Sequence, residues 1–579
     1  PVNSLQNELR SLQQAGVEDS CSLPAPSPEE VKWLYDICPA GNIGDDWKIF
    51  ESREWVRWMQ NEANNVYLSQ CHSALEDHLY RCHDLSDLGP HVIPAETTSG
   101  ISFVCAVCAP RRAIWLYKPL VNGNNDDCIA EANETLKSTQ DLPANIDCFQ
   151  RSSLRAYPEY VLSDQKLWLD IQKSNAANLS LSPEEADVLN TALGGDSFPM
   201  FINGRAGSGK STILCYIAAK YMQHAANSKS NLMPLYLTCN RDLLDKSKQN
   251  SKALLSTNPD FVKEPSDKSK QNSKAPLSTN PDFVEEGNPN GSGYELESSF
   301  SVFSEFLLKR LPEERRTGFA KDSQITFHRF QSLFNDDCHI PEAQNINTEV
   351  SWHIIRSLIK GRWVDNDDYL TPDDYNDLPK DVKESVPSEQ FRTVYDYVWQ
   401  RWYKRKREEG LWDDQDLAIE VLRCRETLNS QEYPAIFCDE AQDFTANELN
   451  IIYRCSLFAK RSLQVHELSR VPVVFAGDPL QTINPTGFRW AEVKANMHEQ
   501  YTRMLARGNE QRAKINIQLK DLRLNYRSNK GIVQFCNSLL ILRLLIDACN
   551  IQLKDLQEPW SISETANVYH FPVDNDGTL

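Results

Sequence analysis

Short apolar runs alternate with longer amphipathic segments through the middle of the chain, and this alternation predicts the fold. Four apolar runs end close to a Gly, Asp or Asn, which is typical of buried parallel strands. They are Phe198–Ile202, Pro234–Thr238, Ala435–Cys438 and Val471–Ala476. Helical patterns such as Thr212–Met222 lie between them. Strands that alternate with helices indicate a doubly wound α/β sheet. We therefore expect an α/β domain over residues 178–510.

The pattern before this domain is different. Residues 1–165 combine helix-like stretches such as Ser52–Leu68 with one strand-like run, Ile101–Leu116, which is interrupted at Pro110. This mixture predicts a separate α+β region of unknown function. Cysteine and histidine residues that leave a zinc site open are Cys71, His72, Cys82, His83, Cys105 and Cys108. The pairs are irregularly spaced, and strand alternation would send Cys105 and Cys108, which are three residues apart, to opposite faces. Both observations favour ordinary buried cysteines.

A polar stretch at residues 246–293 interrupts the α/β pattern. The segment Lys246–Glu264 recurs almost unchanged as Lys268–Glu286. Two copies are too few for a solenoid, which needs about three to bury a continuous core. We therefore expect a flexible surface insertion. A shorter duplication, NIQLKDL, occurs at Asn516–Leu522 and again at Asn550–Leu556.

Composition narrows the class of protein. The 579 residues are 40% apolar and 25% charged, which excludes a collagen-like, wholly disordered or disulfide-scaffold protein. Lys and Arg total 61 against 81 Asp and Glu, and the net charge of −20 argues against a histone-like coat on nucleic acid while leaving room for a local basic channel. No window reaches the roughly 18 apolar residues of a membrane helix. Sixteen cysteines without a signal peptide indicate reduced thiols in a cytoplasmic or nuclear setting.

A glycine-rich loop carries the strongest chemical signal. Residues 204–211 match G-x-x-x-x-G-K-[ST] and lie between an apolar run and a helical pattern, the context that a phosphate-binding loop requires. Its backbone N–H groups close around a phosphate, and the helix N-terminus adds a favourable dipole. We expect Lys210 to reach the β- and γ-phosphates and the Ser211 hydroxyl to bind Mg²⁺. The expected nucleotide-binding residues are Gly204, Arg205, Ala206, Gly207, Ser208, Gly209, Lys210, Ser211 and Thr212, with a chance match as the alternative.

Two later strand ends supply the polar groups that a P-loop enzyme needs. Asp439 ends a predicted buried strand and is expected to hold the metal, and Glu440 is expected to orient and deprotonate the attacking water. An acidic helix start is the alternative for this pair. Gln481 follows the next predicted strand within GDPLQ, and we expect its amide to sense the γ-phosphate.

These strings together resemble the UvrD/Rep-like branch of superfamily 1 helicases over about residues 179–538. The matching strings, in the family's order, are GRAGSGKS (204–211, motif I), PLYLTCNRDLL (234–244, motif Ia), Thr326-Phe327-His328 (the TFH element), DEAQD (439–443, motif II), GDPLQ (477–481, motif III) and Leu524–Ser528 (motif IV). The phrase INPTGFRW (483–490) is most similar to the divergent helicase-like segment of large TPR- and ankyrin-repeat proteins.

The resemblance implies ATP-driven translocation on single-stranded DNA by two RecA-like lobes that close on ATP. It implies that Thr326 and His328 contact the strand and that Arg527 contacts the γ-phosphate. Asn484 stands near the position of the family's base-stacking aromatic, and we expect Phe488 or Trp490 to substitute for it, with core packing as the alternative for both. Residues 331–428 correspond to a helical auxiliary domain. Its basic aromatic stretch, Trp399–Arg407, either tracks phosphates and stacks bases or packs its rings inward.

Two departures from the family pattern leave other functions open. Glu185 stands where the family has an adenine-reading glutamine, and a carboxylate lacks the amide's N–H donors. Motifs V and VI are missing after Ser528, and the chain starts at Pro1 without a methionine. We therefore expect residues 511–579 to be the start of a truncated second RecA-like domain. The function that the sequence favours is an ATP-dependent helicase or translocase. The alternatives are a nucleotide-binding regulatory or scaffold module and an ATPase that acts on RNA.

Overall fold

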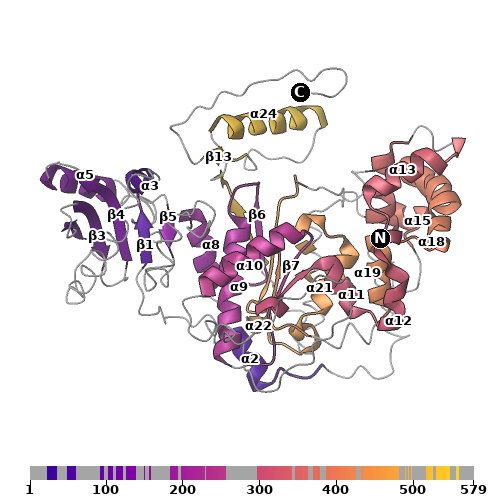
Figure 1. Cartoon of the computed structure of the whole chain (residues 1–579), viewed down its shortest axis with the longest axis horizontal. Helices are drawn as coiled ribbons and strands as arrows, with labels where there is room; N and C mark the ends of the chain where they lie inside the picture. Colours follow the sequence, from indigo (N-terminus) through magenta and orange to yellow (C-terminus); the bar gives the residue numbers. More distant parts are fainter. Residues whose placement is uncertain are drawn as a thin grey trace, which may run out of the picture.

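The computed structural model describes most of the chain between Leu23 and Pro559. The described segments are residues 23–35, 48–59, 91–96, 102–108, 113–120, 125–137, 149, 155–157, 181, 183–193, 197–228, 230–255, 296–341, 346–362, 369–378, 386–424, 432–481, 490, 493–494, 497–498, 517–525, 528, 530–547 and 556–559. Along them, an N-terminal sheet is followed by a central α/β unit with a helical insertion and then by a small C-terminal unit (Figure 1).

A six-stranded sheet in the order β11-β6-β10-β9-β7-β8 forms the centre of the molecule. Its strands are β6 (Met200–Gly204), β7 (Leu235–Thr238), β8 (Phe300–Val302), β9 (Ile436–Cys438), β10 (Val473–Gly477) and β11 (Gln518–Leu522). Every neighbouring pair is parallel. The predicted α/β class and the predicted strands are confirmed. Since parallel strands end at the same edge, the polar residues that follow β6, β9 and β10 meet there.

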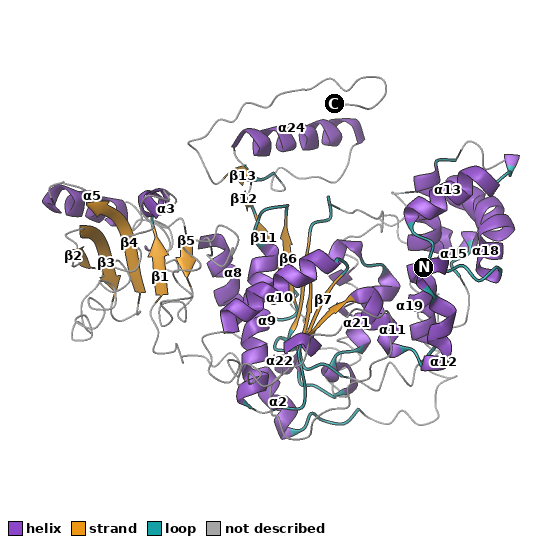
Figure 2. Cartoon of the chain, in the orientation of Figure 1, coloured by secondary structure: helices purple, strands orange, loops and turns teal. Residues whose placement is uncertain are grey.

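Helices cover this sheet (Figure 2). They include α8 (Pro183–Leu193), α9 (Lys210–Asn227), α10 (Arg241–Leu255), α11 (Phe303–Arg310), α21 (Ala446–Arg454) and the one-turn α22 (Val465–Leu468). Every residue of β7, β9 and β10 is buried, as expected for parallel strands that are covered on both faces. Phe201 of β6 stacks on Phe475 of β10, with 5.6 Å between the ring centroids.

Two predicted boundaries are wrong. The sequence predicts that a second domain starts at residue 511, but β11 pairs in parallel with β6 from Gln518↔Met200 to Leu522↔Gly204 and completes the first sheet. The sequence also predicts a flexible insertion from Lys246, but α10 continues to Leu255 and buries Leu254 and Leu255. The polar composition of this segment led to the prediction of a loop. A helix needs only one apolar stripe in order to pack, so a mostly polar segment can still be helical. Residues 256–295, which hold the rest of the repeat, lie outside the described residues.

The insertion predicted at residues 331–428 is helical in its described parts and has its own apolar core. Its elements, with the flanking α12, are α12 (Glu313–Arg316), α13 (Phe327–Asp337), α14 (Thr348–His353), η9 (Ile354–Lys360), α15 (Pro372–Asp377), α17 (Ser388–Thr393), η10 (Val394–Tyr403), α18 (Lys404–Glu408) and α19 (Asp414–Arg423). Within the basic aromatic stretch, Trp399, Trp402 and Tyr403 are buried, so the inward-packing alternative is confirmed.

A buried ion cluster anchors this insertion. The side chain of Lys360 is 1% exposed, and its Nζ lies 2.5 Å from Asp413 Oδ2 and 2.7 Å from Asp416 Oδ1. The Tyr403 hydroxyl donates to the same Asp413 oxygen at 2.6 Å. Burial disfavours the ammonium, but the two carboxylates overcome that effect and raise the pKa of Lys360. Lys360 therefore stays charged and fixes η9 against α19.

The N-terminal region contains a five-stranded sheet in the order β2-β3-β4-β1-β5. It consists of β1 (Lys48–Glu51), β2 (His91–Glu96), β3 (Ser102–Cys108), β4 (Ala113–Leu120) and β5 (Arg155–Tyr157), with helices α3 (Arg53–Met59) and α5 (Asn125–Lys137). Cys105 and Cys108 are buried in β3, and no cluster of His, Cys, Asp and Glu among the described side chains could hold a metal. The paired residues at 71–72 and 82–83 lie outside the described residues.

The first described helix, α2 (Pro28–Tyr35), belongs with the central unit rather than with this sheet. Arg461 donates to the Glu30 carboxylate at 2.7 and 2.9 Å, and the Trp33 ring meets the His224 ring of α9 edge-on at 4.9 Å. The N-terminal region predicted for residues 1–165 is therefore divided between two parts of the structure.

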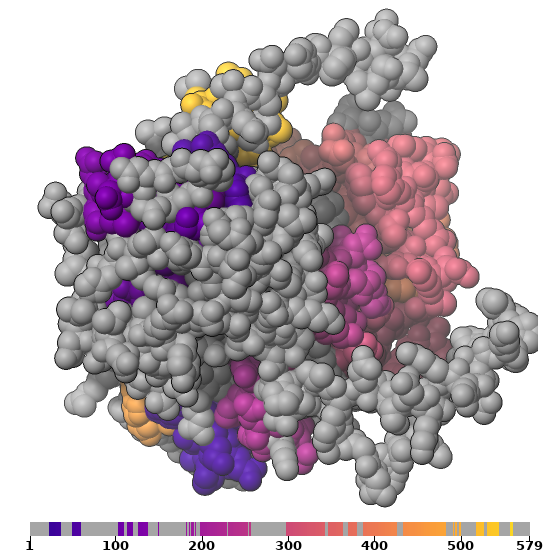
Figure 3. Space-filling model, turned by 60° about the vertical axis from the view of Figure 1, so that its left-hand side comes forward, coloured from indigo at the N-terminus to yellow at the C-terminus, as the bar shows by residue number. Residues whose placement is uncertain are grey.

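The C-terminal unit consists of β12 (Leu524–Asn525), α24 (Lys530–Asp547) and β13 (Glu558–Pro559), in which β12 and β13 pair in parallel. Helix α24 is drawn in yellow at the molecular surface in Figure 3. Its exposed large apolar side chains are Ile532, Phe535, Leu539, Ile541 and Leu542. Among the described helices, none is both long and apolar enough to cross a membrane.

Candidate nucleotide-binding site

The glycine-rich loop connects the end of β6 to the start of α9, as predicted. Gly207 has a φ of 77° and Gly209 a φ of 87°, which L side chains rarely adopt. At Gly204, an added Cβ would lie 2.3 Å from Ser208 Oγ. The three glycines are therefore required by local geometry, which is that of a tight strand–loop–helix turn.

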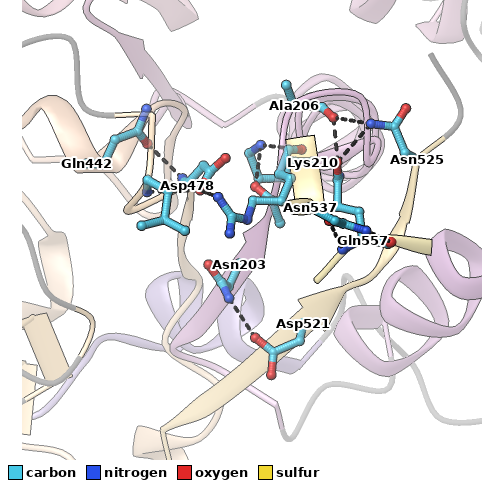
Figure 4. Close-up of polar contacts among 12 residues, drawn as sticks. Asn203, Ala206, Lys210, Gln442, Asp478, Asp521, Asn525, Asn537 and Gln557 are labelled. Carbon is cyan, nitrogen blue, oxygen red and sulfur yellow. Dashed lines mark hydrogen bonds and ion pairs between the residues drawn. The ribbon is translucent and has the colours of Figure 1, made fainter. Parts of the chain in front are cut away.

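Lys210, the first residue of α9, is 6% exposed and turns back into the loop. Its Nζ donates to the carbonyl of Gly204 at 2.7 Å and to that of Arg205 at 3.1 Å (Figure 4). The N-cap residue of α9 is Gly209, so no side chain caps the first turn. A buried ammonium group and the N–H donors of this turn therefore lie together, in an arrangement suited to an anion.

Asp439 lies at the end of β9 and is fully buried. Its carboxylate accepts hydrogen bonds from the Ser211 hydroxyl, from the Tyr236 hydroxyl at 3.2 Å and from the Glu440 backbone N–H at 3.0 Å. Burial raises the pKa of Asp439 to about 6, and the neighbouring Glu440 charge acts in the same direction. A cation beside this carboxylate would relieve both effects.

The donor set fits a Mg²⁺ ion. Mg²⁺ takes oxygen ligands and usually binds through one or two protein groups, completed by waters and substrate phosphates. Ser211 Oγ and the Asp439 carboxylate are oxygen donors that already contact each other.

Glu440 is held in an unusual conformation. Its φ of 54° and ψ of 46° make it the non-glycine residue with a positive φ in the described segments. Such a backbone costs about 1 kcal/mol and persists where the surroundings enforce it. Gln442 in addition fixes the side chain of this residue, because its Nε2 donates to Glu440 Oε2 at 2.6 Å.

Gln442 also connects this loop to the end of β10. Its side chain is buried, and Oε1 accepts the backbone N–H of Asp478 at 2.9 Å. Gly477 makes this approach possible, since a Cβ there would lie 2.8 Å from the same oxygen. The Asp478 carboxylate in turn lies 4.0 Å from the Arg205 guanidinium, which opposes the rise in its pKa caused by burial. A continuous set of contacts thus runs from the P-loop through Asp478 and Gln442 to Glu440.

Sequence reasoning did not assign roles to these connecting residues. Gln442 and Asp478 lie within the quoted strings DEAQD and GDPLQ, so their position beside charged residues was the available signal. Tyr236, which lies in the predicted strand of motif Ia, carried no such signal because a tyrosine in a buried strand is ordinary core composition. Only the fold brings its hydroxyl to Asp439.

Glu185 lies beside the P-loop. It is 4% exposed on α8, and its Oε1 lies 1.5 Å from the position that a Cβ on Gly209 would occupy. The carboxylate therefore packs directly against the N-cap of α9.

The other predicted site residues are distributed more widely. Gln481 follows Asp478 and has an exposed side chain. Thr326 caps α13 by accepting the Arg329 N–H at 3.4 Å, and His328 is exposed on the same helix, so both lie on the helix that leads into the insertion. Trp490 is 9% exposed, and its ring centroid lies 5.3 Å from that of Phe201. Its indole N–H donates to Asn203 Oδ1 at 2.9 Å. Trp490 is thus packed in the core, as the alternative to base stacking predicted. Arg527 and Phe488 lie outside the described residues.

No model of a known protein family matches this chain, and no curated protein matches it either. The functional conclusion therefore rests on the geometry at the sheet edge. That geometry combines an anion-suited loop, a pair of oxygen donors for a hard cation, and a carboxylate held near both.

Proposed function

We propose that this chain is an ATP-dependent translocase or helicase built on a RecA-like α/β domain, in which ATP hydrolysis drives movement along single-stranded DNA. The observation that carries the proposal is the meeting of three groups at one sheet edge. These are the buried Lys210 ammonium, the Ser211–Asp439 oxygen pair and the oriented Glu440 carboxylate. Each group comes from the position that the helicase resemblance assigns to it.

The residues divide the work of phosphoryl transfer. Lys210 would exchange its two carbonyl partners for the β- and γ-phosphate oxygens, while backbone N–H groups of the loop surround the phosphates. Ser211 and Asp439 would hold Mg²⁺, which neutralises charge that develops on the phosphates. Glu440 would accept a proton from the attacking water, with Gln442 holding its carboxylate in place.

Steady-state ATP hydrolysis with and without single-stranded DNA tests this function. Glu440→Gln keeps the size of the side chain but removes the proton acceptor, so we expect turnover to fall by at least about a hundredfold while Mg·ATP still binds. Gln481→Ala, in an exposed side chain of the same edge, should reduce turnover less if Glu440 carries the proton transfer. Hydrolysis by Glu440→Gln at the wild-type rate would contradict the assigned mechanism.

Competition between single-stranded DNA and RNA of the same sequence distinguishes the polymer. We expect DNA to stimulate hydrolysis more strongly than RNA. Stimulation by RNA alone would favour the RNA-dependent ATPase. Lys210-dependent binding of ATP without turnover, with or without either polymer, would favour a nucleotide-binding regulatory or scaffold module.

A further inference from the structure

Two side-chain amides from the C-terminal unit bind one carbonyl of the P-loop. Asn525 Nδ2 donates to the Ala206 carbonyl at 3.0 Å, and Gln557 Nε2 donates to the same oxygen at 3.3 Å (Figure 4). Asn525 Nδ2 also donates to Gln557 Oε1 at 2.9 Å. A carbonyl oxygen has two lone pairs, so both acceptor positions of Ala206 are used. Asn525 and Gln557, called here the amide clamp, are more than 300 residues from the loop in sequence.

The clamp is itself firmly held. Asn525 is 4% exposed, and its Oδ1 accepts the Ser528 N–H at 2.8 Å. The backbone of Gln557 makes a reciprocal pair with Asn537 of α24, in which Asn537 Nδ2 donates to the Gln557 carbonyl at 2.8 Å and Asn537 Oδ1 accepts the Gln557 N–H at 3.1 Å. The position of α24 therefore determines where the Gln557 amide lies.

The Glu184 carboxylate of α8 provides a second attachment for the C-terminal unit. It accepts the backbone N–H groups of Arg523, at 2.9 and 3.0 Å, and of Leu524, at 3.0 Å. The unit is thus held on the α/β unit both through α8 and through the P-loop. Of these two contacts, the one through the P-loop acts on a residue of the candidate phosphate site.

The clamped carbonyl belongs to the peptide group whose N–H is that of Gly207. A peptide group is planar, so fixing the direction of the Ala206 C=O also fixes the direction of the Gly207 N–H. Glycine adopts positive and negative φ almost equally well, and without an anchor this peptide could turn over at little cost. In a P-loop the N–H groups face the phosphate, so a turned peptide would present a carbonyl oxygen to it.

We propose that Asn525 and Gln557 are positioning residues of the nucleotide site: by holding the Ala206 carbonyl they keep the Gly207 N–H directed at the phosphate, and they couple nucleotide binding to docking of β12, α24 and β13. The inference rests on the proposed nucleotide site and extends it to its regulation. Coupling is reciprocal, so a nucleotide that needs the clamped loop also strengthens docking of the C-terminal unit.

Nucleotide affinity of clamp variants provides the first test, with Mg·ADP as the probe for the full chain. Asn525→Ala and Gln557→Ala each remove one hydrogen bond to Ala206, and we expect each to weaken Mg·ADP binding about fivefold. The double variant should lose less than the product of the two, because the amides also bind each other. The matched control is Gln534→Ala, on the exposed surface of α24. We expect it to bind Mg·ADP as the wild type does.

Amide hydrogen exchange provides a readout that does not depend on the variants folding. In the wild type, Mg·ADP should slow exchange in β12 and α24 by a factor similar to the affinity lost in the double variant. Two results would overturn the clamp inference while the nucleotide site stands. One is Lys210-dependent Mg·ADP binding that is equally tight in wild type and clamp variants, and the other is an exchange rate in β12 and α24 that Mg·ADP does not change. If wild type and Lys210→Ala bind Mg·ADP equally, the proposed site fails and the inference fails with it.

Discussion

Replacement of Gly209 by alanine tests whether the P-loop and α8 pack as described. The added Cβ would lie 1.5 Å from Glu185 Oε1, 2.4 Å from its Cδ and 3.0 Å from its Cγ. Ordinary van der Waals contact begins near 3.4 Å, so the whole carboxylate must move. Glu185 is 4% exposed, so the displaced carboxylate must find another buried position or turn out towards solvent. The positive φ adds a second cost, because alanine adopts a φ of 87° poorly.

The two costs can be separated by a matched glycine. Gly410 has the same φ of 87°, but a Cβ there would meet no atom within 4 Å. Gly410→Ala should therefore cost only the backbone term, about 1 kcal/mol. Gly209→Ala should cost about 1 kcal/mol for the backbone and a further 1–3 kcal/mol for overpacking. Removing the obstructing side chain in Gly209→Ala/Glu185→Ala should recover most of that extra loss.

Urea unfolding of wild type, Gly209→Ala, Glu185→Ala and the double variant, read as free energies of unfolding, measures this double-mutant cycle, and Gly410→Ala is unfolded alongside them. We expect Gly209→Ala to be less stable than Gly410→Ala, and a favourable coupling of at least about 1 kcal/mol between the substitutions at positions 209 and 185. Equal losses for the two glycine variants, within about 0.5 kcal/mol, would refute the contact between Glu185 and the N-cap of α9.

Three further predictions concern charge and packing. Burial raises the pKa of Asp439 from 3.8 to about 6, so its charge destabilises the fold above that pH. In metal-free buffer at pH 8, Asp439→Asn should raise the free energy of unfolding by up to about 3 kcal/mol. This gain should vanish as the pH falls through 6 towards 4. A gain unchanged at pH 4.5 would disprove the titration. Lys360→Met leaves two buried carboxylates without their cation and should cost about 3–5 kcal/mol in urea unfolding, whereas Lys252→Met, at an exposed ion pair, should stay within about 0.5 kcal/mol. Replacing residues 256–293 with a short linker should leave the melting temperature nearly unchanged, but extending the deletion back to Lys246 should lower it clearly, because it removes the buried end of α10; equal melting temperatures for the two deletions would show that this end contributes nothing.

The central strands were predictable because their signal is local. A run such as Val471–Ala476 is apolar at successive positions, and a strand buried on both faces requires that. The P-loop was predictable for the same reason, since its glycines and Lys210 are contiguous. Edge strand β11 was not, because QLKDL is only half-buried and its pairing with β6 spans more than 300 residues. Such a partner is specified by the tertiary fold rather than by local pattern.

The candidate site was predicted as a set of charged groups but not as a connected one. Asp439 and Glu440 follow a predicted strand downstream of a P-loop, and that combination favours a metal ligand and a general base over an acidic helix start. The bridge through Gln442 depends on a side chain that reaches between two strand ends, which no spacing in the sequence encodes. Trp490 illustrates the opposite case, because an aromatic residue after a motif reads equally well as a base-stacking group or as core. Burial against Phe201 is visible only in the folded chain.

Titration calorimetry of Mg·ATP binding to wild type and Lys210→Ala tests whether this sheet edge binds nucleotide. We expect one site per chain in the wild type and an affinity at least about a hundredfold lower in Lys210→Ala, because the loop loses the buried ammonium group that meets the phosphates. Thermal unfolding of both proteins without nucleotide controls for folding. Equal affinity in two folded proteins would contradict the assignment of the nucleotide site to this sheet edge.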